Sequence, residues 1–364
     1  MLNEKMYQFW LSNIEGIGPR KYKALIERCN TASNVFQCGK EDLLGIPYIS
    51  SKDVNRIVAL RNEDIIMRKY DELGKKGVRF VSQGDKEYPT LLLQMYDPPI
   101  GLYVKGSMPK VNQKCIAIVG ARECSQYGRD MAKLYGQTFS RAGVAVISGM
   151  AMGVDGCAHR GALSGSGGTY AVVGCGVDVC YPRTNYRLYN EIAENGGIIS
   201  EYPPGTRVSP GHFPMRNRII MGMSLAVVVV EARNKSGSLI TAQLAADAGR
   251  EVFVVPGHIT DSLFEGGRQL ALSGAQMTAG PESIMDYFEI SEPKFNISLE
   301  NLNNLLETTE KIVYANLRCE PKHIDEIIQS SGLPATQVMK SLISLECRNL
   351  CKQVVQNYYV KIVV

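Results

Sequence analysis

The stretch LAVVVVEARNKSGSLITAQLAADAGREVFVVPG, residues 225–257, carries the clearest signal of the fold. It begins and ends with short apolar runs rich in β-branched residues, and residues 239–248 between them have the apolar spacing of a helix. The runs are apolar at consecutive positions, as expected of strands that helices cover on both faces. A strand, a helix and a second strand in this order predict a unit of a parallel sheet.

The same pattern extends from this stretch toward the N-terminus. Three further apolar runs are expected to be strands: CIAIVG at 115–120, VAVISG at 144–149 and TYAVVG at 169–174. We therefore predict an α/β domain over residues 80–290, with a doubly wound, mostly parallel sheet. The turn-rich residues 84–109 and the polar residues 289–304 are the expected joints.

Two smaller modules are expected on either side of this domain. Residues 1–75 include LSNIEGIGPRKYKALIERC at 11–29, two helix-like runs around a Gly-Ile-Gly-Pro turn. Such a helix-hairpin-helix can aim backbone N–H groups at a DNA phosphate, or Gly16 and Gly18 simply cap and reverse the helices. Residues 303–364 predict three helices and a β-hairpin, the order of a winged helix. Its third helix offers Lys340 and Arg348 as cations, so DNA binding and a packing or partner-binding role both stay open.

Composition excludes several classes of protein. The 364 residues carry a net charge of +4, weaker than the footprint of a strongly basic nucleic-acid binder, so the global charge decides nothing about the function and local clustering must. The N-terminus lacks a secretory pattern and the apolar runs are of strand length, so we expect a cytoplasmic protein without a membrane segment. The ten cysteines are scattered, and the sequence has neither a P-loop nor a Gly-x-Gly-x-x-Gly fingerprint. No metal site and no cofactor are expected.

The loops that follow the predicted strands point to an anion site. In a parallel sheet these loops and the N-termini of the next helices face one crevice. Here they are rich in Gly and Ser, which let a phosphate approach the backbone, and Arg122 adds a guanidinium. Any one of these loops could be only a tight strand-to-helix turn, but together they indicate a phosphate-lined groove.

Other polar residues allow more than one interpretation. Arg216 and Arg218 could both reach a ligand from an extended segment, but on a helix they point about 200° apart, and they could belong to an internal ion-pair network. Phe213 and Pro214 offer a face on which a base can stack. Glu201 and Glu231 could act as acid or base groups or pair with the arginines. Asp155 could orient His159 or cap a helix.

Several motifs together resemble a known family. IVGARECSQYG, SGMAMGVDGCAHRGAL, FPMRNRIIMGMS, VVVVEARNKSGSLITAQLAADAGREVFVVPG and GGRQLALSGA are similar, in order and spacing, to the bacterial DprA/Smf family. The resemblance implies an extended Rossmann-like central domain and a cytosolic homodimer that is a mediator rather than an enzyme. Members bind single-stranded DNA, protect incoming strands and load the RecA recombinase during natural transformation.

The resemblance also implies a set of DNA-binding residues. It assigns Gly120, Arg122, Ser125, Ser148, Gly149, Gly153, Asp155, Phe213, Arg216, Asn217, Arg218, Ser236, Gly237, Ser238 and Thr241. Two positions depart from the family pattern: Met152 replaces the usual arginine, and Arg268 replaces the usual asparagine.

Two alternatives from other classes remain. Phosphoribohydrolase-like nucleotide enzymes of the same broad fold use a PGGxGTxxE loop after the corresponding strand. Here that loop reads ARNKSGSLITA and supplies no glutamate two residues after its leucine. A non-catalytic sensor of a small nucleotide is the second alternative.

Overall fold

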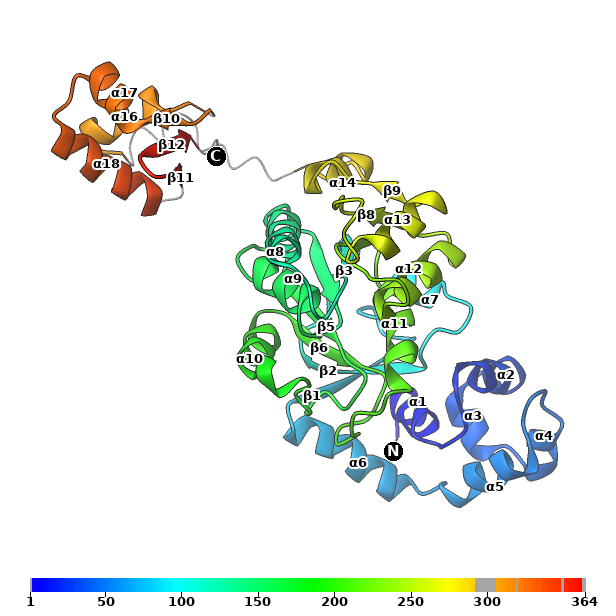
Figure 1. Cartoon of the computed structure of the whole chain (residues 1–364). Helices are drawn as coiled ribbons and strands as arrows, with labels where there is room; N and C mark the ends of the chain where they lie inside the picture. Colours follow the sequence, from blue (N-terminus) through cyan, green and yellow to red (C-terminus); the bar gives the residue numbers. More distant parts are fainter. Residues whose placement is uncertain (1, 292–305, 319, 348–349, 362–364) are drawn as a thin grey trace. The chain divides into compact units, whose positions relative to one another are not determined.

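The computed structural model of the chain describes residues 2–291, 306–318, 320–347 and 350–361 (Figure 1). It comprises two compact units, Met1–Pro293 and Lys294–Val364. No helix in the described ranges is long and apolar enough to cross a membrane.

The first unit is built on a nine-stranded sheet with the order β1-β2-β6-β5-β4-β3-β7-β8-β9. Every neighbouring pair from β6 to β9 in this order is parallel, and β1 and β2 add an antiparallel edge. The strands are β1 Val78–Ser82, β2 Gly101–Gly106, β3 Cys115–Val119, β4 Ala145–Ser148, β5 Thr169–Val172, β6 Gly197–Ser200, β7 Ala226–Val229, β8 Glu251–Val254 and β9 Gln276–Met277. The five predicted strands are β3, β4, β5, β7 and β8, which confirms the doubly wound, mostly parallel sheet.

Helices cover both faces of this sheet (Figure 1). Helices α8, α9 and α14 share a core with one face, and α7, α11 and α12 share a core with the other. In β3, Ile116 and Ile118 face the first group while Ala117 and Val119 face the second. Burial of both sides explains why the strands are apolar without alternation. The helices of this region are α7 Thr90–Leu93, α8 Gln126–Arg141, α9 Val154–Ala162, η1 Arg183–Asn185, α10 Tyr186–Asn195, α11 His212–Gly222, α12 Gly237–Asp247, α13 Glu265–Leu272 and α14 Pro281–Tyr287.

The order of the strands reverses next to β3. After β3 the chain adds β4, β5 and β6 on one side, and then returns through α11 to place β7 on the other side of β3. The loops after β3 and β7 therefore diverge, and they open a crevice at the carboxyl ends of these two strands. Ligands of doubly wound sheets bind at such a switch point.

Six helices precede the sheet in the described residues. They are α1 Glu4–Ser12, α2 Pro19–Cys29, α3 Ala32–Gln37, α4 Lys40–Leu44, α5 Ser51–Ala59 and α6 Glu63–Lys75. Of these, α1 and α6 pack against the strands β1 and β2 of the sheet. The rings of Phe9 and Phe80 meet edge to face with centroids 5.5 Å apart, and the Asn13 amide donates to the Tyr103 hydroxyl at 2.7 Å. One hydrophobic core thus continues from these helices into the sheet. The predicted bounds of an N-terminal domain stay a prediction.

The second unit is a winged helix, as predicted. It consists of α16 Thr308–Asn316, β10 Lys322–His323, α17 Ile324–Ser331, α18 Ala335–Cys347, β11 Cys351–Val355 and β12 Tyr358–Lys361. Gly332 ends α17 in the left-handed conformation, and Val313, Ile327, Val338 and Leu342 form the core. Arg348, one of the two cations considered for DNA binding, lies outside the described residues.

Candidate functional site

An open groove of about 730 Å³ occupies the switch point at the carboxyl ends of β3 and β7. Its walls come from the loop after β3, the start of α9, the first turns of α11 and the loop that leads into α12. Most of the predicted site residues line it: Gly120, Arg122, Asp155, Phe213, Arg216, Asn217, Ser236, Gly237, Ser238 and Thr241. The residues assigned from the sequence therefore mostly line one groove, but their side chains have different roles in it.

The wall formed by the start of α12 is basic and open. Arg233 and Lys235 are exposed in the loop before the helix, and Gly237 at the first helical position is exposed as well. The Ser236 side chain caps the helix by accepting from the Ser238 N–H at 3.4 Å. The positive end of the helix dipole and two cations favour an anion here.

The prediction missed Arg233 and Lys235. The signal was present in the quoted loop, where both cations stand directly before the Ser-Gly-Ser cap.

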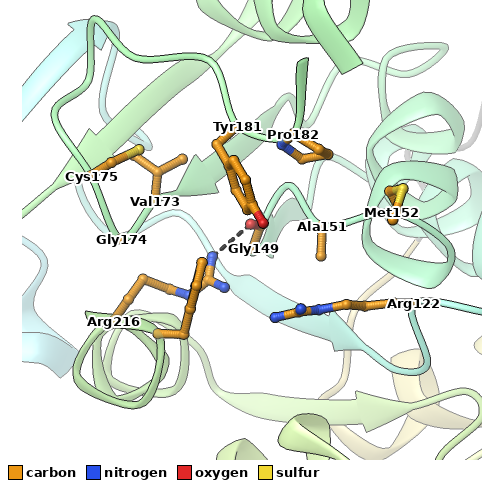
Figure 2. A pocket seen from close by; sticks show the side chains of 11 residues that line it. Arg122, Gly149, Ala151, Met152, Val173, Gly174, Cys175, Tyr181, Pro182 and Arg216 are labelled. Atoms are coloured by element: carbon orange, nitrogen blue, oxygen red, sulfur yellow. Dashed lines mark hydrogen bonds between the residues drawn. The ribbon is translucent and has the colours of Figure 1, made fainter. Parts of the chain in front are cut away.

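Arg216 is buried at the floor of the groove. Its Nη1 donates to the Gly149 carbonyl oxygen at 2.6 Å (Figure 2). The same Nη1 donates to the Val172 carbonyl oxygen at 2.5 Å, and Nε donates to Asn217 Oδ1 at 3.1 Å. Burial lowers the pKa of this guanidinium, and the nearby Asp155 carboxylate opposes the shift. Arg216 fixes α11 to the ends of β4 and β5 and also presents positive charge to the groove.

Arg218 lies elsewhere. Its side chain is 7% exposed, pairs with the Glu201 carboxylate and donates to the Asp97 carbonyl at 2.7 Å. Burial raises the pKa of Glu201, and Arg218 opposes that shift. Arg218 is absent from the residues that line the groove. The internal ion pair, one of the two interpretations of the sequence, describes this residue.

Aromatic and cationic side chains meet in a smaller pocket that opens beside the groove. The Arg122 guanidinium lies 5.4 Å from the centre of the Phe213 ring, and the Tyr181 and Phe213 ring centroids are 5.9 Å apart. Figure 2 shows Tyr181 above Arg122 and Arg216, with Met152 at the edge. Flat rings beside guanidinium groups provide a surface on which bases can stack.

The loop after β3 does not present an open helix terminus. The Glu231 carboxylate accepts from the Ser125 N–H at 2.9 Å and from its hydroxyl at 2.5 Å, at the start of α8. A Cβ at Gly128 would collide with this carboxylate. Glu231 therefore occupies the place at the α8 N-terminus where an external anion would bind. Ser125 lines a separate pocket with Glu231 rather than the groove.

The loop after β4 is closed in the same way. The Asp155 carboxylate accepts from the backbone N–H groups of Gly149 at 3.1 Å and Ala151 at 3.4 Å. Burial raises the pKa of Asp155, and the Arg216 charge opposes the shift. A Cβ at Gly149 would come within 2.5 Å of Arg216 Nη1 and 2.7 Å of Asp155 Oδ2. Gly149 is thus the position at which these two opposite charges approach.

The remaining predicted residues hold the fold. The Ser148 hydroxyl donates to the Ile118 carbonyl at 2.6 Å, between β3 and β4. Gly153 has a φ of +75°, and a Cβ there would collide with the carbonyl groups of Ala121 and Arg122. Neither residue lines the groove. Both residues set the distance between the loops that line the groove.

The two departures from the family pattern are in different places. Met152 lines the groove and is 48% exposed. Arg268 donates to the Ile259 carbonyl at 3.1 Å and does not line the groove. The cation gained at Arg268 therefore does not replace, within the groove lining, the cation that Met152 lacks.

Comparisons with known proteins agree with this architecture. Residues 79–289 match the family described as DNA recombination-mediator protein A, and residues 302–355 match a DprA winged helix domain. The chain is 30% identical to Protein Smf from Synechocystis over 96% of its own length and 97% of that protein's.

Two solved structures are similar to the chain. DNA processing protein A from Streptococcus pneumoniae has a TM-score of 0.66 and 30% identity, covering 79% of this chain and 98% of that one. DNA processing protein A from Helicobacter pylori, described for its single-stranded DNA binding mode, has a TM-score of 0.53 and 29% identity, covering 58% of this chain and 95% of that one.

Proposed function

The chain belongs to the DNA recombination-mediator protein A family, also called DprA or Smf, and on that premise we propose that it binds single-stranded DNA in the groove between β3 and β7. We further propose that it acts in the cytoplasm as a homodimer, protects incoming DNA and loads RecA during natural transformation. The relative from Helicobacter pylori, whose single-stranded DNA binding has been described structurally, supports the choice of ligand.

One observation carries the proposal. The groove combines an open helix N-terminus at Gly237 with exposed Arg122, Arg233 and Lys235, and the Phe213 ring lies beside them. Cations and backbone N–H groups bind phosphates, and rings stack on bases of any sequence. Such a combination suits an unpaired strand, in which both the backbone and the base faces are accessible.

The internal carboxylates close two of the strand-to-helix turns to a mononucleotide phosphate and leave the exposed α12 N-terminus as the place where one could bind. A nucleotide enzyme or sensor of this fold would place a phosphate at the helix terminus after a strand. Glu231 fills that place at α8, and Asp155 binds the free N–H groups after β4. A small phosphate ligand would have to displace a buried carboxylate at either position.

The groove also lacks the geometry of a catalytic centre among the described residues. Asp155 is committed to two backbone N–H groups. His159 is fully buried, shares a 2.7 Å hydrogen bond with Thr169, and has a pKa that burial lowers to about 3. It is a neutral core histidine and does not serve as a general base. We therefore propose a binding protein rather than an enzyme.

Fluorescence anisotropy with a labelled oligonucleotide of mixed sequence tests the proposal. We expect binding that weakens steeply with salt, because phosphate neutralisation releases counterions, and weak competition by duplex DNA and by mononucleotides. If the oligonucleotide does not bind, or if a mononucleotide displaces it, the result would favour a nucleotide enzyme or a nucleotide sensor instead. Analytical ultracentrifugation tests the homodimer, and a RecA strand-exchange assay tests loading.

A further inference from the structure

The N-terminal helices contain two copies of one hairpin that differ at one informative position. The turn between α1 and α2, residues 13–18, and the turn between α4 and α5, residues 45–50, follow the same conformation residue by residue. In both, the second residue donates from its N–H to a carbonyl three residues earlier, as Ile14 does to Leu11 and Ile46 to Leu43. The fifth residue does the same, as Ile17 does to Ile14 and Ile49 to Ile46.

The fourth position of each turn has a left-handed backbone. In the first hairpin it is Gly16, with φ +89°, and in the second it is Tyr48, with φ +67°. Glycine adopts this conformation freely, whereas a bulky side chain there is strained. The ring of Tyr48 is nevertheless 58% exposed. Because this side chain is exposed, packing in a hydrophobic core does not explain why a strained tyrosine occupies the position.

Two further side chains extend the surface around Tyr48. The exposed guanidinium of Arg20, from the first hairpin, lies 3.8 Å from the centre of the Tyr48 ring. Tyr96, in the loop after α7, is 83% exposed. A hydrogen bond with Tyr48 raises the pKa of Arg20, and Tyr96 adds a smaller effect in the same direction. We call Arg20, Tyr48 and Tyr96 the hairpin platform.

The loop that carries Tyr96 is fixed to the helix that also borders the groove. Met95 packs against Gly222 of α11, and the Asp97 carbonyl accepts from Arg218 of the same helix. Asn217 and Ile220 of α11 line the groove. The groove and the loop of Tyr96 therefore lie along different sides of one helix.

We propose that the hairpin platform is a second contact for single-stranded DNA, on which bases of a strand bound in the groove stack. This inference rests on the proposed function. Exposed tyrosine rings and a guanidinium stack on unpaired bases of any sequence, and the same guanidinium can pair with a phosphate. In duplex DNA the base faces are covered, so an unpaired strand is the ligand that this chemistry fits.

The test compares a short oligonucleotide of about 8 nucleotides, which the groove alone can hold, with one of about 30 nucleotides. We expect the full-length wild-type protein to bind the longer one more tightly. Tyr48→Gly and Tyr96→Ala should each weaken binding of the longer one by about fivefold or more and leave binding of the shorter one unchanged. Tyr96→Phe keeps the ring and should bind as the wild type does.

Two controls keep the result interpretable. Tyr48→Gly removes the ring but suits the left-handed backbone, so its thermal stability should equal or exceed that of the wild type. Arg28→Ala removes an exposed cation from the far end of α2 and should not change DNA binding.

Unchanged binding of the longer oligonucleotide by both tyrosine variants would overturn the inference and assign the platform to a protein partner, since exposed Tyr and Arg also favour protein interfaces. Failure of the wild type to bind either oligonucleotide would instead refute the proposed function itself.

Discussion

Replacement of Arg218 separates the two roles that an arginine in this motif can have. Its guanidinium is buried, pairs with Glu201 and donates to the Asp97 carbonyl. Arg218→Ala leaves the Glu201 side chain, only 21% exposed, without its cation. Removal of one partner from a buried ion pair costs about 3–5 kcal/mol. We expect a loss of unfolding free energy in this range and a fall in the thermal midpoint on the order of 10 °C.

The pH dependence of this variant gives a second readout. Burial already raises the pKa of Glu201, and the loss of Arg218 raises it further. The folded variant then holds a proton that the unfolded chain has released, so its stability falls as pH rises above the ordinary pKa of a glutamate. Glu201→Gln in the Arg218→Ala background removes the buried charge and should restore part of the stability at the higher pH.

Urea denaturation and single-stranded DNA anisotropy, measured on the same preparations, decide the question. We expect the folded variant to bind DNA within about twofold of the wild type, since Arg218 is outside the groove lining. A variant of unchanged stability with DNA affinity reduced tenfold or more would show that Arg218 contacts the strand and would refute the ion-pair interpretation.

Three further predictions follow from the site and the fold. Lys235→Ala and Arg122→Ala should each weaken single-stranded DNA binding by about 1.5–3 kcal/mol. Anisotropy at several salt concentrations should also show that each variant reduces the slope of log affinity against log salt by about 0.7. An unchanged slope would contradict a phosphate contact. Gly128→Ala should cost about 1–3 kcal/mol of stability in urea, because its Cβ collides with Glu231, while DNA binding by the folded protein stays unchanged. Burial of Asp53 raises its pKa, but hydrogen bonds from Lys21 and Ser50 outweigh this effect and lower the pKa to about 2. The ionised carboxylate therefore stabilises the folded protein above about pH 4, and this stabilisation should be lost as pH falls toward 2. The unfolding free energy of Asp53→Asn, measured by denaturation, should depend less on pH over this range.

The central strands were predictable because of their burial. A strand covered on both faces, such as β7, must be apolar at nearly every position, and few other segments of that length are. Strand β6 escaped prediction because it has only Ile198 and Ile199 between small residues. Strand β2 lies in residues 84–109, which we expected to be a joint, and its pairing with β6 depends on contacts distant in sequence.

The site shows a comparable limit. The motif placed Arg216 and Arg218 together, and only the helical phase of α11 directs one to the groove and the other to Glu201. From the sequence, Glu231 could be an acid or base group or pair with an arginine, and Asp155 could orient His159 or cap a helix. In the structure their carboxylates accept hydrogen bonds from the Ser125 and Gly149 N–H groups. These bonds form because separate loops lie close together in the fold, and no local sequence pattern predicts that proximity.

The continuous core between the N-terminal helices and the sheet has a consequence for any ligand that touches both. Phe9 on Phe80 and Asn13 on Tyr103 hold the hairpins at a separation from the groove that side-chain packing fixes. A flexible tether would offer a range of separations and a gradual gain in affinity with ligand length. Here packing fixes the helices to the sheet. We therefore expect the affinity for single-stranded DNA to rise in one step, once the strand is long enough to contact both the groove and the hairpins.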